Sequence, residues 1–173
     1  MKHSENGWPI CRLEDIADIA SGVTKGRQLE GPTVTVPYLR VANVQAGRLD
    51  LSEIKEIEVL APEVDKYRLK AGDILMTEGG DRDKLGRGTV WRGQIDPCIH
   101  QNHVFRVRPQ AGRLVSEYLN YYMLTPAAKK YFLHCAKQTT GIASINRTQL
   151  SGLPVPLPPP DDQKRIIAIL DKA

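Results

Sequence analysis

The sequence predicts an α+β fold: a mixed, mainly antiparallel twisted sheet or barrel-like globule with short helices, followed by the start of a C-terminal helix. Through the middle of the chain, short β-type runs alternate with glycine-containing polar turns, which is typical of antiparallel strands. Between residues 118 and 135, apolar side chains instead recur at helical spacing. Near the C-terminus, three consecutive prolines precede a stretch with one apolar-leaning side.

Length and composition bound the class of protein. The chain has 173 residues, of which 41% are hydrophobic and 25% are charged, as in an ordinary soluble domain with a core. No apolar run is long enough to cross a bilayer and no signal peptide is visible, so we expect no membrane partner. The three cysteines are widely spaced, at Cys11, Cys98 and Cys135. An odd number at such spacing indicates reduced thiols and a cytoplasmic location.

The first element is predicted to be a short helix over residues 13–20. Its apolar face is formed by residues at i, i+3, i+4 and i+7, namely Leu13, Ile16, Ala17 and Ala20. We expect the helix to end at Ser21 and Gly22, because glycine readily takes the left-handed conformation found after helices. A polar, glycine-containing loop follows over residues 22–35.

The central part of the chain is predicted to consist of strands and turns. The expected strands are short runs rich in β-branched, aromatic and other apolar residues, at 36–41, 54–60, 74–76, 89–91 and 104–107. Pro37 favours an edge position or a strand start for the first of them. The segment 77–88 contains four glycines among charged residues, which predicts a loop.

Two helices are predicted over residues 118–135. The apolar pattern is interrupted at Thr125 and Pro126, where the proline suits the first turn of the second helix. Because the aromatic residues of this stretch recur at helical spacing, the pattern favours a core position for them over a base-stacking platform.

The C-terminal part is predicted to be a polar loop over 138–147, a helical turn over 146–150 and an extended proline-rich segment over 153–160. Asp161 is expected to cap a final helix. One side of this helix is apolar-leaning and coiled-coil-like in spacing, with Gln163, Ile166, Ile167 and Leu170.

Charge is distributed unevenly along the chain. Residues 1–65 contain 7 Lys and Arg against 11 Asp and Glu, whereas residues 66–150 contain 14 against 6. A basic middle segment in a chain of net charge +4 is compatible with one phosphate-facing surface. The same distribution also fits a solvated surface of mixed charge, so charge alone leaves both interpretations open.

Sequence signatures of catalysis are nearly absent, and we predict neither catalytic residues nor a metal site. There is no Walker-type loop and no strand-linked G-x-G-x-x-G. Glu53 and Lys55 form a Glu-x-Lys of the kind that metal-dependent nucleases use, without an obvious upstream acid. Cys98, His100 and His103 suggest a zinc cluster, but no second Cys/His pair lies nearby to complete four ligands.

Polar loops carry side chains suited to DNA. Arginine pairs with guanine and Gln or Asn with adenine, while Lys, Ser and Thr suit phosphates, and His and Gln at 100–101 are further donors and acceptors. Plain surface loops are the alternative interpretation. The candidate DNA-binding residues are Lys25, Arg27, Gln28, Arg82, Asp83, Lys84, Arg87, His100, Gln101, Gln138, Thr139, Thr140, Ser144, Asn146 and Arg147.

Taken in order, several short motifs resemble the target recognition domains of type I restriction-modification specificity subunits (the HsdS family). They are Trp8 with Leu13-Glu14-Asp15-Ile16, Pro37-Tyr38-Leu39-Arg40-Val41 with Gly47-Arg48-Leu49-Asp50, Lys66-Tyr67-Arg68-Leu69 with Gly72-Asp73-Ile74-Leu75, and Thr140-Gly141 with Leu153-Pro154-Val155-Pro156-Leu157-Pro158 and Gln163. Their order and spacing over nearly the whole chain make the resemblance specific. The family's usual Glu-Gln is Asp162-Gln163 here.

The resemblance implies a non-catalytic, sequence-specific DNA-binding component that reads one half of a bipartite site. Residues 1–158 would form the recognition domain and 159–173 the start of a conserved spacer helix. Double-stranded DNA, methyltransferase subunits and a restriction or translocase subunit would be the partners, with S-adenosylmethionine, ATP and Mg²⁺ on those subunits only. The chain would be a truncated piece, which the short final helix favours, or a half-size subunit that pairs with itself. A metal-dependent nuclease and a structural protein-interaction domain remain the alternatives.

Overall fold

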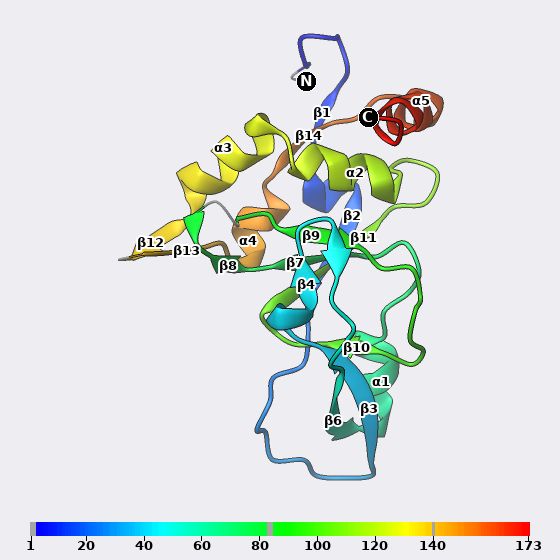
Figure 1. Ribbon diagram of the computed structural model, residues 1–173, viewed down its shortest axis with the longest axis vertical. Coiled ribbons are helices and arrows are strands. Elements are labelled where there is room, and N and C mark those ends of the chain that lie inside the picture. The colour runs from blue at the N-terminus through cyan, green and yellow to red at the C-terminus, as the bar shows by residue number, and fades with distance from the viewer. Residues whose placement is uncertain (1–2, 83–84, 140) are drawn as a thin grey trace.

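The structure is a computed structural model that describes residues 3–82, 85–139 and 141–173. It is elongated, with a four-stranded sheet across the middle, several helices at one end and a smaller sheet with one helix at the other (Figure 1). Among the described residues, none of the helices combines the length and the apolar character needed to span a bilayer. The predicted α+β class and the mainly antiparallel pairing are confirmed, with the strands divided among several small sheets.

The central sheet holds the largest part of the core. Its order is β2-β11-β7-β9 and all of its pairs are antiparallel, with β2 at Ala17–Ser21, β11 at Val104–Pro109, β7 at Ile74–Thr77 and β9 at Gly88–Val90. All residues of β7 are buried, and so are the first four of β11. A strand buried on both faces reads as a continuous apolar run, as Ile74-Leu75-Met76 does in β7, whereas β11 includes the buried Arg106 among its apolar residues.

The helical end covers one face of this sheet. It contains α2 (Ser116–Met123), α3 (Pro126–Cys135), α4 (Arg147–Ser151), α5 (Pro160–Leu170), the 3-10 helix η1 (Leu13–Asp15) and the two-stranded pair β1 (Ile10–Arg12) with β14 (Pro154–Pro156). Pro126 is the first residue of α3, as predicted. Phe132 and Leu119 are fully buried against the sheet, so the aromatic residues of this stretch contribute to the core.

The opposite end is a smaller sheet of order β10-β3-β6. Its elements are β3 (Thr33–Leu39), β6 (Lys55–Leu60), α1 (Ala61–Tyr67) and β10 (Ile99–His100), with the 3-10 helix η2 (Val41–Asn43) and the hairpin β4 (Val44–Gln45) and β5 (Arg48–Leu49) beside it. Pro37 lies inside β3, but β10 pairs only with Tyr38 and Leu39. The proline therefore has a partner strand, β6, on one side alone.

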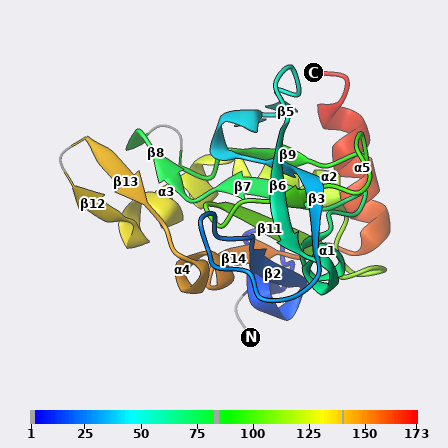
Figure 2. The ribbon, with the colours of Figure 1, turned by 90° about the horizontal axis from the view of Figure 1, so that it is seen from below.

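A third small sheet projects from the side of the molecule. It consists of β8 (Gly79–Gly80), β12 (Lys137–Thr139) and β13 (Ile142–Ser144) in the order β12-β13-β8. Seen from below, it stands clear of the central sheet (Figure 2). The predicted loops over 77–88 and 138–147 are therefore corrected, because each contributes strand residues to this sheet.

The predicted helix over 13–20 is wrong beyond its first turn. Residues 13–15 form η1. From Ala17 the chain forms β2, which is the outer strand of the central sheet and pairs with β11. Along β2 the exposed Asp18 is followed by the buried Ile19, which is strand alternation. Pairing with β11 overrides a helical pattern that eight residues alone cannot stabilise.

Gly22 has a different role from the predicted helix end. It does not have a positive φ, and a Cβ built on it would lie 1.9 Å from the backbone oxygen of His100. Glycine is needed here because two main chains approach each other closely.

Two helix starts also differ from the prediction. No helix is predicted over the residues of α1, where Glu63 accepts from the backbone N–H of Leu60 at 3.2 Å and so caps the first turn. Asp161 is not the cap of α5: Pro159 takes that position, and Asp161 lies in the first turn. Gln163 is fully buried rather than part of an open stripe.

Candidate nucleic-acid interface

Four polar segments meet along one side of the molecule. They are residues 22–28, 78–82, 101–103 and the described parts of the last polar stretch, 137–139 and 141–147, and we call the surface that they form the seam. Its lower part is held by the main chain: the N–H of Val23 donates to the oxygen of His100 at 2.8 Å, and the N–H of Asn102 donates to the oxygen of Val23 at 3.0 Å. These bonds join the first loop to the segment after β10.

The upper part of the seam continues through Glu78. Its N–H donates to the oxygen of His103 at 3.2 Å, and its oxygen accepts from the N–H of Ile145 at 2.7 Å. Gly79 and Gly80 then pair with Ser144 and Ala143 of β13. Segments far apart in the sequence thus form one continuous surface through backbone hydrogen bonds, from the 22–28 loop to the projecting sheet.

Arg27 fixes the position of the 22–28 loop. Its two terminal nitrogens each donate to a carboxylate oxygen of Glu63 on α1 at 2.8 Å, and its Nε donates to the oxygen of Thr24 at 3.1 Å. The hydrogen bond from Arg27 holds the pKa of the Glu63 carboxyl below its usual value. With its guanidinium occupied in this way, Arg27 positions the loop rather than presenting a free fork to a base.

Arg87 lies in a hollow beside the seam. Its Nη1 donates to Oε1 of Gln45 at 3.0 Å, which links β4 to the segment before β9. The hollow has a volume of about 330 Å³ and is bordered by Arg87, Gly79 and Ile142, among others. Ile142 is 58% exposed on the projecting hairpin.

The remaining candidate DNA-binding residues differ in the solvent exposure of their side chains. Those exposed along the seam are Lys25, Gln28, Arg82, Asn146 and Arg147, and those half-buried are Gln101 and Ser144. Gln138 and Thr139 lie in β12, paired with Ala143 and Ile142. Asp83, Lys84 and Thr140 lie outside the described residues.

Asn146 has a structural function in addition to its exposure. Its Oδ1 accepts from the N–H of Gln149 at 2.9 Å, and Oε1 of Gln149 accepts from the N–H of Asn146 at 2.8 Å. This reciprocal capping box starts α4 and places Arg147 at the first helical position.

His100 does not belong to the surface, so its predicted contact with DNA is corrected. The side chain is fully buried, and Nδ1 lies 2.6 Å from the oxygen of Val104. Because that oxygen can only accept, Nδ1 must carry the proton. Burial lowers the pKa of His100 to about 4, so the ring is neutral at pH 7.

The two alternative metal sites gain no support. Cys98 is buried, which raises the pKa of its thiol to about 12. Glu53 pairs with Lys55 at 3.6 Å and with Arg40 at 3.5 Å. Within the described ranges, no three His, Cys, Asp or Glu side chains are grouped so that they could hold a metal ion. The three cysteines are free, as predicted.

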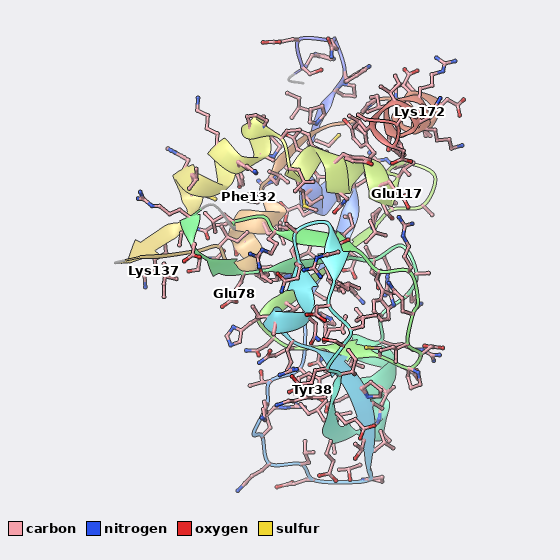
Figure 3. All side chains as sticks on the ribbon, in the orientation of Figure 1. Tyr38, Glu78, Glu117, Phe132, Lys137 and Lys172 are labelled. Atoms are coloured by element: carbon pink, nitrogen blue, oxygen red, sulfur yellow. The ribbon has the colours of Figure 1, made fainter. Side chains whose placement is uncertain are left out.

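Sequence reasoning missed two side chains at the middle of the seam. Nδ1 of His103 lies 2.8 Å from Oε1 of Glu78, the side chain labelled in Figure 3, and both side chains are partly exposed. From the sequence, His103 is a possible metal ligand or polar loop residue and Glu78 belongs to the predicted loop over 77–88, but neither is among the candidate DNA-binding residues. The available signal was position: Glu78 directly follows a buried strand and precedes two glycines.

Comparison with known proteins gives one consistent result. The family "Type I restriction modification DNA specificity domain" matches residues 5–173. A protein assigned as the type I restriction enzyme MjaX specificity subunit of Methanocaldococcus jannaschii is 29% identical over 165 residues, covering 94% of this chain and 38% of its own length. The type I restriction enzyme StySPI specificity subunit of Salmonella potsdam is 28% identical, covering 95% and 36%.

Solved structures agree in fold. The crystal structure of the HsdS subunit from Thermoanaerobacter tengcongensis superposes with a TM-score of 0.64 at 22% identity, covering 99% of this chain and 38% of that one. The chain therefore spans less than two fifths of the length of the relatives that it matches.

Proposed function

The chain belongs to the family of type I restriction modification DNA specificity domains, and from this we propose that it reads one half of a bipartite DNA site through the seam. One observation carries the proposal: four polar segments from distant parts of the sequence are joined by backbone hydrogen bonds into a single surface. Lys25, Arg82 and Arg147 are exposed along it and supply positive charge for phosphates or donors for guanine.

The proposal extends to the assembly. Residues 1–158 form the recognition domain and 159–173 begin the spacer helix, in the cytoplasm, where free thiols are stable. Methyltransferase subunits and, through the complex, a restriction subunit are the partners, with S-adenosylmethionine, ATP and Mg²⁺ on those subunits only.

Duplex binding tests this function. Arg147→Ala is expected to weaken binding to the preferred duplex, on the order of tenfold, while random duplex changes less. Arg165→Ala is the matched control, because Arg165 is exposed on α5, which lies well apart from α4 and the projecting sheet in Figure 1. Affinity should also fall steeply with salt. Equal losses on both duplexes would make Arg147 a phosphate contact, and salt-independent affinity would contradict a DNA-facing seam.

A further inference from the structure

Glu78 occupies the middle of the seam, and its place there is set by the main chain. Its N–H and its carbonyl oxygen bond to His103 and Ile145, so the segment after β10 and the projecting hairpin meet at this residue. Figure 3 shows Glu78 on the same side of the molecule as Lys137 and on the side opposite Glu117. The carboxylate therefore stands at a fixed point of the surface that we propose faces DNA.

The side chain of Glu78 is oriented by His103. A carboxylate can only accept a hydrogen bond, so Nδ1 of His103, at 2.8 Å, donates to Oε1. The second oxygen, Oε2, has no protein partner among the described residues. The Glu78 and His103 side chains are 38% and 50% exposed. The pair thus presents one oriented acceptor that a ligand can reach.

The fold does not require this pair. The two segments that it links are already joined by the backbone bond from Glu78 to His103, and Asn102 is bonded to Val23 beyond it. An exposed ion pair or charged hydrogen bond contributes little to stability, because solvent screens it. A structural reason for an acidic side chain at this point is therefore weak.

A negative charge on a DNA-facing surface is unfavourable near phosphates, but it is useful against a base. In the major groove a carboxylate accepts a hydrogen bond from the exocyclic amino group of cytosine. Adenine also offers an amino group, but its N7 acceptor lies beside it and repels a carboxylate, whereas cytosine has only a carbon there. The acceptor-only chemistry of Glu78 thus matches cytosine among the four bases.

We propose that Glu78 is a base-reading residue that selects a cytosine in the half-site, and that His103 is its positioning residue. The inference rests on the proposed function, since it names the chemistry read at one point of the same surface. The hydrogen bond runs from the cytosine N4 amino group to the oxygen of Glu78 that His103 leaves free.

The test is selection of bound duplexes from a randomised library by the chain and its variants. Glu78→Gln keeps the shape but replaces one oxygen with a donor, so the preference for cytosine at one position should fall on the order of tenfold, with other positions unchanged. Glu117→Gln is the matched control, because Glu117 is also a partly exposed glutamate with an ionic partner, Arg92. Its base preferences should equal those of the unchanged chain.

Four outcomes would overturn the inference, its positioning part or the proposed function in distinguishable ways. If Glu78→Gln raises affinity equally for all duplexes, Glu78 is only a repulsive charge. If His103→Ala leaves the cytosine preference intact, His103 does not position it; the expected result is a partial loss at the same base pair. If the unchanged chain prefers no base at any position, the proposed function fails together with this inference, whereas a clear preference that Glu78→Gln does not alter overturns the inference alone.

Discussion

At the helical end, side chains join the elements, whereas along the seam the main chain joins them. The hydroxyl of Tyr118 donates to the oxygen of Pro156 at 2.7 Å, and that of Tyr122 donates to the oxygen of Pro154 at 2.6 Å. Both bonds tie α2 to β14 through groups that a single substitution can remove.

Gln163 is the most connected of these side chains. Its Oε1 accepts from the N–H of Val115 at 2.8 Å, and its Nε2 donates to the oxygens of Arg113 and Pro158 at 2.8 and 2.9 Å. The fully buried side chain thus joins α5 to the start of α2. No comparable amide is buried in the described part of the seam, where Val23, Asn102 and Glu78 are held by backbone bonds.

This difference means that the side chains that stabilise the fold and the side chains available to a ligand lie in different regions. Where the backbone holds the surface, the side chains remain available for a ligand, and exchanging them leaves the hydrogen bonds of the fold in place. Where side chains hold the structure, each exchange leaves buried polar groups unpaired. Four predictions test the contrast.

The largest effect is expected for Gln163→Leu. Leucine fills a similar volume and keeps water out, so three backbone groups that face the buried side chain lose their partner, and stability should fall by about 4 kcal/mol. Urea unfolding measures this loss. Gln28→Leu, at an exposed position of the seam, should change stability by only about 0.5 kcal/mol. Similar losses in the two variants would remove the contrast between the regions.

A change to the backbone of the seam should also be costly. Gly22→Ala places a Cβ against the backbone of His100, and a shift of both main chains is expected to cost about 3 kcal/mol. Gly26 has a positive φ of 78° but open space around it. Gly26→Ala therefore measures only the cost of placing a side chain in the left-handed conformation, about 1 kcal/mol. If both variants unfold at the same urea concentration, the close approach at Gly22 is unimportant.

Protonation should weaken the core beneath the seam. Burial lowers the pKa of His100 from 6.5 to about 4, so below pH 6.5 the unfolded chain binds a proton that the folded chain does not. Stability is therefore complete above pH 6.5 and should fall by about 3 kcal/mol as the pH drops to about 4. Unfolding measured across this range, with His100→Gln as reference, checks it; parallel curves for the two proteins would contradict it.

The smallest effect on stability is expected for Glu63→Gln. The amide keeps an acceptor for the helix cap at Leu60 but loses the charge paired with Arg27, at an expected cost of about 0.5 kcal/mol. Amide exchange in residues 24–28 should nevertheless become faster. Asp96→Asn breaks a similar bidentate pair with Arg68 and should leave this exchange unchanged. Unaltered exchange in Glu63→Gln would show that Arg27 does not hold the loop.

The fold was predictable where burial alone decides the structure. The buried β7, the buried first four residues of β11 and the helices on either side of Thr125 and Pro126 follow from apolar pattern and proline chemistry. The strand β2 was not predictable, because its conformation depends on pairing with β11. This partner strand lies more than 80 residues away in the sequence. Local pattern cannot report such a contact.

The candidate site was predictable only in part, because contacts between distant segments also decide which of its side chains reach the surface. Lys25, Arg82 and Arg147 were found as exposed basic residues in polar loops, and the structure exposes them. His100 was predicted to contact DNA and His103 was not, yet burial removes the former from the surface and leaves the latter beside Glu78. That contact joins two segments 25 residues apart, and no spacing rule anticipates it.

The two strands at the centre of the molecule give it a mechanical property. β7 ends one residue before Glu78, and β11 begins directly after His103 and leads back toward Arg113, where Gln163 bonds. A load applied to α5 would pass through Gln163 and along β11, which is paired on both sides. Stretching such a strand requires several hydrogen bonds to shear together, so the connection is stiff. The final helix and the seam are thus connected through one buried side chain, the turn that ends at Arg113 and a strand that is paired on both sides.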